Sequence, residues 1–485
     1  MDDNAAFQAP KLGIGMIFSS ALKPFLQRRP DALDVLEIEP QTLWLADDPF
    51  EGPYFEFTPA IDMFAAFPQR KLVHSVGMPI GGTRKPHPAQ INLLRSIADR
   101  LDSPWVSEHL AIAGTPHKAA GFLLPPLQTD EGVRIASENI RTFAQGMGRP
   151  VAIETGVAYF ARKGFEMQDG EFVARICEET GCGILLDLHN IYCNEKNGRI
   201  PMRDFLAQIP LDRVWEIHLA GGQAMDGYWL DSHSGEMPDD LAAFSREVVQ
   251  SLPNLGALNF EIYDTFLERL PPEELDRTID ALREIWEQAG VSRSDAPPHV
   301  PPSRPTIDEP APTSAVWEDG ATRAVWQDDP SQHDWPEDTA ALRLYSRLAR
   351  SFRGSMLVRA MPRSLRYLLL RDGGGAETLL SRFHTAHDPR LFTPLEAQSF
   401  ADFVIAQGEL DPWLLALLDY DLAFLNIVRQ GKAQLIRFPG DPTILFEGLA
   451  AAQLPDDLPD NPPWEIELLP DGFTVADFTR TPAAS

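Results

Sequence analysis

The stretch of sequence that most constrains this chain runs from Gly183 to Gly235, where polar side chains follow two apolar segments. Gly183–Asp187 and Val214–Leu219 have the length and the branched side chains of buried strands. The polar residues that end or follow these segments are Asp187, His189, Asn190, His218, Asp231 and His233. Carboxylate and imidazole groups at successive strand ends are how a parallel α/β barrel builds a metal site, so the sequence predicts one here.

Eight strand-like segments precede residue 262, and most of them are separated by segments with helical periodicity. They are Leu12–Phe18, Val35–Glu39, Leu72–Ser75, Trp105–Glu108, Val151–Glu154, Gly183–Asp187, Val214–Leu219 and Ala257–Glu261. The segments are almost continuously apolar, as strands covered on both faces should be. This alternation predicts an α/β fold, a (β/α)8 or TIM barrel, over residues 1–290.

Side chains able to bind metal end six consecutive predicted strands, the third to the eighth. A lone histidine at such a position is more often an ordinary polar residue of the barrel mouth. Six in succession favour one shared site, because active sites of these barrels lie at the carboxyl ends of the strands. The nine candidate ligands are His74, His109, Glu154, Asp187, Asn190, His218, Asp231, His233 and Glu261. Of these we assign the chemistry to Glu154, Asp187 and His218.

Nine nitrogen and oxygen ligands without a thiolate exceed the needs of one zinc ion, which takes three or four protein ligands. The set favours two or three ions that accept octahedral geometry, such as iron or manganese. Carboxylates can bridge ions, and we expect Glu154 to be the bridge. His189 either binds metal or orients Asp187. We expect His117 to be an exposed histidine outside the site.

The formal net charge of −29 argues against nucleic acid as a partner. No apolar run approaches the roughly 20 residues of a membrane span, and the N-terminus does not resemble a signal peptide. The three cysteines, Cys177, Cys182 and Cys193, imply no disulfide framework. We therefore expect a cytoplasmic protein that binds neither nucleic acid nor a membrane.

Proline, serine and acidic residues dominate from Ser292 to Pro336, which predicts a disordered linker over residues 291–337. Its tryptophans are unusual in a plain spacer, and docking on a domain surface is the second interpretation. They are Trp317, Trp326 and Trp335. Such a linker predicts that the parts on either side of it are separable.

Residues 338–485 are expected to form a smaller α+β domain. Helical spacing begins at Ala340 and again at Asp411, and two hairpins are expected near the end. The hairpins would pair AQLIRF with TILFEGL, and WEIELL with FTVADF. We find neither a nucleophile–base pair nor metal-ligand spacing in this region and expect it to bind rather than catalyse. Eight arginines between Arg343 and Arg371 indicate a solvated helix face, or in part a docking site for an acidic peptide or a neighbouring domain.

Over residues 11–265 the chain resembles the multinuclear non-haem iron-dependent oxidative enzymes, the family of the methanobactin-biosynthesis oxidase. The resemblance rests on HSVG at His74, SEHL at His109, IETG at Glu154, LDLHN at Asp187 and Asn190, IHLAGG at His218, DSH at Asp231 and His233, and Glu261. It implies a barrel that holds two or three irons and uses dioxygen to modify residues, often cysteine, of a ribosomally made precursor peptide. The C-terminal domain is loosely similar to the partner proteins that recognise the peptide leader, which implies recognition by the fused domain, with or without a separate partner protein.

The chain departs from the family pattern at Gln41-Thr42, where Glu-Asn is common, and at His189-Asn190, where Asn-Asn is common. Two other interpretations remain open. One is a zinc or manganese barrel of the sugar-isomerase or endonuclease type, acting as an isomerase or hydrolase. The other is a non-catalytic, metal-dependent scaffold whose functional part is the C-terminal domain.

Overall fold

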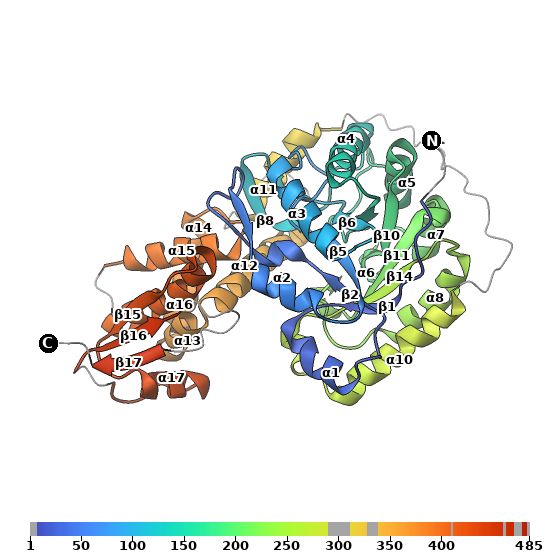
Figure 1. The fold of residues 1–485 in the computed structure, drawn as a ribbon. Coiled ribbons are helices and arrows are strands. Elements are labelled where there is room, and N and C mark those ends of the chain that lie inside the picture. The colour runs from blue at the N-terminus through green and yellow to red at the C-terminus, as the bar shows by residue number, and fades with distance from the viewer. Residues whose placement is uncertain are drawn as a thin grey trace.

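The computed structural model describes residues 7–289, 311–326, 338–408, 411–458, 462–469 and 478–482. Its centre is a closed barrel of eight parallel strands surrounded by helices (Figure 1). The strands are β1 (Gly13–Ile17), β2 (Val35–Ile38), β5 (Arg70–Ser75), β6 (Val106–His109), β9 (Val151–Glu154), β10 (Gly183–Asp187), β11 (Val214–Ala220) and β14 (Ala257–Glu261). They follow the order β1-β14-β11-β10-β9-β6-β5-β2 around the barrel. Each predicted strand overlaps an observed one, and the predicted TIM barrel is confirmed.

Helices cover the outer face of the barrel and bury one apolar side each against it (Figure 1). They are α1 (Lys23–Arg28), α2 (Thr58–Ala65), α3 (Pro88–Arg100), α4 (Asp130–Met147), α5 (Asp169–Thr180), α6 (Leu188–Lys196), α7 (Met202–Gln208), α8 (Asp239–Val248), α9 (Asp264–Leu267) and α10 (Pro272–Gln288). Helix α4 shows how local sequence sets their bounds. The Thr129 side chain accepts a hydrogen bond from the Gly132 amide at its start, and Gly148 ends it in the left-handed conformation.

Three short antiparallel hairpins extend the barrel where strands β2, β6 and β11 end. They are β3–β4 (Trp44–Ala46 and Tyr54–Glu56), β7–β8 (Ile112–Thr115 and Lys118–Leu124) and β12–β13 (Gln223–Met225 and Tyr228–Leu230). We predicted none of them. Five of their six strands have only three or four residues, which carry too few apolar positions for a pattern to show. All three rise on the carboxyl-end face, beside the predicted site.

The expected disordered linker is wrong for the part that the structure describes. Ser314–Val325 forms helix α11, and the Thr313 side chain accepts from the Val316 amide at its start. The Trp317 indole is buried and donates to Pro125 O at 3.3 Å, and the Trp326 indole donates to Ala120 O at 2.7 Å. Docked tryptophans, our second interpretation, are therefore what this segment shows, whereas Trp335 lies outside the described residues.

The C-terminal region is an α+β unit with its own apolar core, as expected. Its helices are α12 (Thr339–Ala360), α13 (Pro362–Arg371), α14 (Gly373–Ala386), α15 (Thr393–Ile405), α16 (Pro412–Gln430) and α17 (Thr443–Ala450). Strands β15 (Gln434–Phe438), β16 (Trp464–Leu468) and β17 (Phe478–Pro482) make an antiparallel sheet in that order. Figure 1 shows this unit beside the barrel, with α12 between the two.

One of the two predicted hairpins is wrong. The segment TILFEGL forms helix α17, and β15 pairs with β16 instead. Leu445 and Leu449, four residues apart, both face the core, which is the spacing of a helix rather than of a strand. The other hairpin exists, but its second strand begins only at Phe478, and most of FTVADF lies outside the described residues.

The arginine cluster is not simply a solvated helix face. Arg353 of α12 is fully buried, and its Nε donates to Glu396 Oε1 at 2.6 Å while its guanidinium stacks over Trp326. Arg347, in contrast, forms an exposed ion pair with Asp226 of the β12–β13 hairpin. Some of these arginines therefore hold the C-terminal unit against α11 and the barrel.

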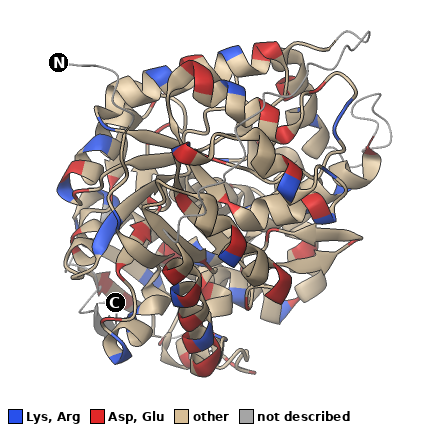
Figure 2. Ribbon diagram, turned by 90° about the vertical axis from the view of Figure 1, so that its right-hand side faces the viewer, with Lys and Arg blue, Asp and Glu red and all other residues tan. Residues whose placement is uncertain are grey.

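Charged residues are spread over many elements rather than gathered on one. Figure 2 shows acidic and basic positions interspersed along the outer helices. Among the described residues, we find no helix that combines the length and the apolar character needed to cross a membrane.

Candidate metal centre

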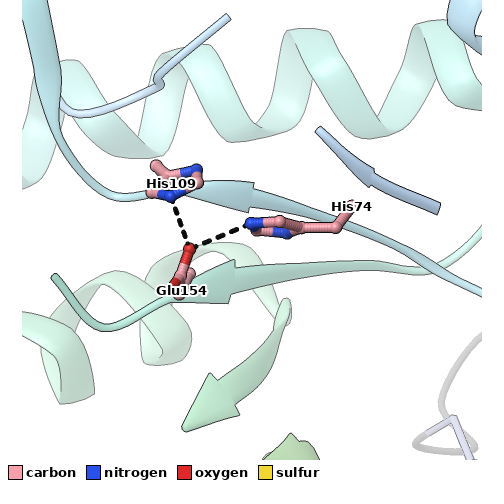
Figure 3. A group of neighbouring side chains, drawn as sticks. All are labelled: His74, His109 and Glu154. Carbon is pink, nitrogen blue, oxygen red and sulfur yellow. Dashed lines mark ion pairs between the residues drawn. The ribbon is translucent and has the colours of Figure 1, made fainter. Parts of the chain in front are cut away.

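Two histidines and a carboxylate from three adjacent strands meet at one atom. His74 is the penultimate residue of β5, and His109 and Glu154 are the last residues of β6 and β9. All three side chains therefore lie at the mouth of the barrel (Figure 3). Glu154 Oε2 lies 3.2 Å from His74 Nε2 and 2.8 Å from His109 Nε2. Both His74 and Glu154 are buried. The structure thus brings together side chains that lie 35 and 45 residues apart in the chain.

A second group forms on the opposite strands around Glu261, the last residue of β14. Its Oε1 lies 2.7 Å from His218 Nδ1, and its Oε2 lies 3.0 Å from His233 Nε2. The same nitrogen of His233 lies 3.0 Å from Asp231 Oδ1. Glu261 therefore spans two histidines, as Glu154 does in the first group.

Asp187 lies between the two groups. Ligand atoms of Glu154, Asp187 and His218 all lie within 4.8 Å of one another. Asp187 Oδ1 accepts from the Asn190 amide at the start of α6, while the Asn190 side chain donates to Thr155 O. Asp187 Oδ2 and Asn190 Oδ1 are buried, and neither has a hydrogen-bond partner among the described residues. All nine predicted ligands thus surround one region at the barrel mouth.

These donor atoms suit divalent cations. Two donors in adjacent positions about 2.1 Å from an octahedral ion lie about 3 Å apart, as the carboxylate and imidazole atoms of both groups do. Buried oxygens without a partner are unfavourable by about 1–3 kcal/mol each, and a cation would satisfy them. The residues present therefore fit metal ions, and their number fits more than one.

The other nitrogen of each strand-end histidine has a polar partner, which orients the ring. His74 Nδ1 lies 2.8 Å from Ser107 Oγ, and His109 Nδ1 lies 3.3 Å from Ser75 O. Because a carbonyl only accepts, His109 carries a proton on Nδ1, and Nε2 is the nitrogen that faces Glu154. His218 likewise has a polar partner at each ring nitrogen, Glu37 at Nε2 and Glu261 at Nδ1.

Electrostatics also favour positive charge in this pocket. Burial alone would lower the pKa of His109 and His218, but Glu154 next to the first and Glu261 next to the second raise both well above the ordinary value. Burial likewise raises the pKa of Asp187 well above its ordinary value, and the carboxylates of Asp231, Glu261 and Glu154 add to the shift. Protons and metal ions would compete for these atoms.

A buried polar layer beneath the mouth went unpredicted. Glu37 Oε2 of β2 lies 2.8 Å from His218 Nε2 and accepts from Asn259 Nδ2 at 3.0 Å. Asn259 also donates to Glu216, which accepts from the Trp105 indole. Burial, and then the charge of Glu216, raises the pKa of Glu37 to about 7. The sequence signal for this layer is a glutamate inside an otherwise apolar strand, namely Glu37 in VLEIE and Glu216 in VWEIH.

Glu39, at the end of the second predicted strand, was also missed. Burial raises the pKa of its carboxyl, and the imidazoles of His74, His109 and His233 act against that shift. The carboxyl therefore lies within electrostatic reach of both groups. Glu39 lies immediately after β2, and a polar side chain at a strand end is the same pattern that predicts ligands for six other strands.

His189 contacts a different carboxylate from the one that we expected. Its Nδ1 lies 2.9 Å from Asp231 Oδ1, so it orients Asp231 and not Asp187. The two glycines of IHLAGG permit this approach, since a Cβ at Gly222 would lie 2.6 Å from His189 Nε2 and one at Gly221 would lie 2.2 Å from Ser234 O. His117 is exposed, as expected.

A closed parallel barrel with a histidine–carboxylate cluster at its carboxyl-end face defines a TIM-barrel enzyme with a candidate metal centre. The chain belongs to the family of RiPP precursor modification enzymes MbnB/TglH/ChrH, where RiPP denotes a ribosomally synthesised and post-translationally modified peptide. The model of that family matches residues 12–269. The resemblance inferred from the strand-end motifs is thereby confirmed.

Curated relatives carry the name UPF0276 protein, which states no activity. The one from Caulobacter vibrioides strain NA1000 is 31% identical over 218 residues, which are 44% of this chain and 75% of the relative. Those from Streptomyces avermitilis and Chromobacterium violaceum are 30% and 33% identical over 45% and 37% of this chain. The chain spans only 45% and 65% of the length of these two relatives.

Among solved structures, D-allulose 3-epimerase from Methylomonas sp. is similar at 16% identity and a TM-score of 0.38. The similarity covers 58% of this chain and 98% of the epimerase. At this level it concerns the barrel alone and bears on neither substrate nor chemistry.

Proposed function

We propose that this chain is a multinuclear iron, dioxygen-dependent oxidase that modifies residues of a ribosomally made precursor peptide, with cysteine as the expected target. The single observation that carries the proposal is the placement of Asp187 between two histidine–carboxylate groups. Membership of a family that modifies such precursors supplies the substrate class. The two other interpretations of the sequence gain no comparable support.

The ligand set supports more than one ion. Two histidines and one carboxylate are the ligands of mononuclear non-haem iron sites that react with dioxygen, and the set of His74, His109 and Glu154 matches that composition. A second set consists of His218, Glu261 and the loop residues Asp231 and His233. We propose Glu154 as the bridging carboxylate because its oxygen is within 4.8 Å of Asp187 and His218 as well. Glu261, which spans two histidines, is a further candidate bridge.

Iron bound here would supply the activation of dioxygen and the electron transfers of the oxidation. The protein's own groups would orient each ligand histidine so that the nitrogen facing the barrel mouth is deprotonated and the other ring nitrogen is protonated. Ser75 O does this for His109 by accepting a hydrogen bond from Nδ1. Burial of His218 and Glu261 would keep water away from the innermost ligands. We assign peptide binding to the C-terminal unit, where the described residues contain no group of metal-ligating side chains.

The test combines metal analysis with turnover. Protein purified without oxygen and reconstituted with both iron and zinc should retain more than one iron per chain. With a cysteine-containing precursor peptide encoded beside the gene, it should consume dioxygen and change the peptide mass. His117→Ala, at an exposed position outside the site, is the matched control for His109→Ala. Stoichiometric zinc without iron, or peptide conversion that needs no dioxygen, would contradict the proposal.

A further inference from the structure

Helix α12 belongs to two apolar cores at once. Residues of its first half, Leu342 and Tyr345 among them, pack with loops of the barrel mouth and with α11. Residues of its second half, such as Leu357, pack in the core of the C-terminal unit. The helix therefore carries the C-terminal unit directly onto the face of the barrel that holds the candidate metal centre (Figure 1).

The contact between α12 and the barrel is centred on Tyr345. This side chain is fully buried, and its hydroxyl oxygen accepts a hydrogen bond of 3.0 Å from the Tyr159 amide. Its ring packs against those of Tyr159 and Phe160, with centroids 5.3 Å and 4.6 Å away. Asp338, just before the helix, adds a second tie, because its Oδ2 accepts from the Ala161 amide.

Tyr159 in turn contacts the loop that carries two candidate ligands. It lies in the segment after β9, five residues beyond Glu154, and its hydroxyl accepts from the Asp231 amide at 3.1 Å. Asp231 Oδ1 contacts His189 and His233. A continuous series of hydrogen bonds thus runs from Tyr345 on α12, through Tyr159, to Asp231.

The Asp231 loop needs such support. His233 has a φ of 44°, in the left-handed region that residues with a side chain seldom adopt. That conformation turns its imidazole toward Asp231 and Glu261, and it persists only where surrounding contacts hold it. The amide of Asp231, two residues earlier, is one place where such a contact is made.

We infer that Tyr345 is a positioning residue of the barrel site: α12 holds Tyr159, and Tyr159 holds the Asp231–His233 loop in the geometry that binds metal. The C-terminal unit is then part of the metal centre's support as well as its proposed peptide-binding partner. This inference rests on the proposed metal site. It predicts coupling between the domains without any direct contact of α12 with a ligand atom.

The test uses the full chain with ferrous iron alone, under anaerobic conditions. Tyr345→Phe and Tyr159→Phe each remove one oxygen and keep the ring packing. Loss of groups that orient ligands typically weakens metal binding about 10- to 100-fold. We expect about a tenfold loss for Tyr159→Phe and a smaller one for Tyr345→Phe, in chelator competition. Arg347→Ala, on the same helix but in an exposed ion pair, is the matched control and should bind iron as the unmodified chain does.

A double-mutant cycle separates positioning from mere stability. If Tyr345 acts through the Tyr159 hydroxyl, Tyr345→Phe should weaken iron binding in the unmodified chain but not in the Tyr159→Phe background. Urea unfolding of the metal-free variants gives the stability change independently. Unchanged iron affinity and stoichiometry in folded Tyr345→Phe and Tyr159→Phe would overturn the inference, whatever their stability. Failure of the unmodified chain to bind iron would instead contradict the proposed function.

Discussion

His218 and Glu37 form an ion pair inside the barrel, with 2.8 Å between Nε2 and Oε2 and neither side chain exposed to solvent. Glu37 thereby holds the outer nitrogen of His218 and leaves Nδ1 facing Glu261, 2.7 Å away. Such a carboxylate behind a ligand histidine orients the ring and makes it a stronger ligand. Glu37 lies on β2, on which the sequence motifs placed no ligand.

Glu37→Gln should therefore weaken metal binding about tenfold, because the amide cannot supply the negative charge that supports His218. Chelator competition on the anaerobic protein measures this. Glu216→Gln is the matched control, since Glu216 lies in the same layer but its nearest oxygen is 3.6 Å from His218 Nε2. An equal loss in both variants would argue for a general effect of the buried layer rather than for orientation of His218.

Metal affinity should rise with pH above neutrality. Burial opposes protonation of His109, His218 and His233, but nearby carboxylates raise the pKa of each well above 6.5. A metal ion must displace those protons, so binding strengthens as pH rises from about 6.5 toward the raised pKa values. Iron affinity measured between pH 6 and 9 that does not change would show that these histidines are not ligands.

The stability of the metal-free protein should instead fall as pH rises. A histidine whose folded pKa is raised contributes stability that is fully present below its unfolded pKa, near 6.5, and is lost as pH rises through the folded value. Urea unfolding of the metal-free chain should thus show decreasing stability above pH 7. Adding metal should reduce or reverse this trend.

Glu154→Ala should abolish metal-dependent turnover without unfolding the barrel. The side chain lies at a strand end, and its removal leaves the apolar layers intact. Leu185→Ala, in the neighbouring strand and fully buried, should instead lower the free energy of unfolding by about 2–5 kcal/mol. Calorimetry and oxygen uptake on both variants give the comparison. Retained turnover by Glu154→Ala would place the chemistry elsewhere.

Helix α11 should contribute to stability as a core element. Trp317→Ala should lower the free energy of unfolding by about 3–5 kcal/mol, since the indole is buried and hydrogen-bonded. Val316→Ala, one residue earlier and exposed, should change it by less than about 0.5 kcal/mol. Equal effects in urea unfolding would indicate that α11 does not dock in solution.

The two parts of the chain should not be separable at the predicted linker. A fragment ending at Ala289 lacks α11 and α12 and would expose the apolar residues of the barrel mouth, Tyr159 and Phe160 among them. A fragment ending at Arg350 keeps both contacts. Soluble yield and iron stoichiometry should favour the longer fragment. Equal behaviour would support the independent domains that the linker composition predicted.

The sequence by itself determined the barrel and the identity of most of its site. Strand alternation and helix periodicity are local properties, and the end of a strand can be recognised within a few residues. Parallel strands of a closed barrel end on one face, so residues such as His74 and Glu261 could be placed in one site without knowing any distance. The ligand types then followed from the chemistry of the side chains.

Only the tertiary structure decided which groups meet across the chain. His189 contacts Asp231 and not Asp187, because the loop after β11 folds back over the strand end where Gly221 and Gly222 allow close approach. Tyr345 reaches Tyr159 across 186 residues. Such contacts depend on loop conformation and on packing between distant segments, whose free energies are realised only when the whole core forms, and no local pattern encodes them.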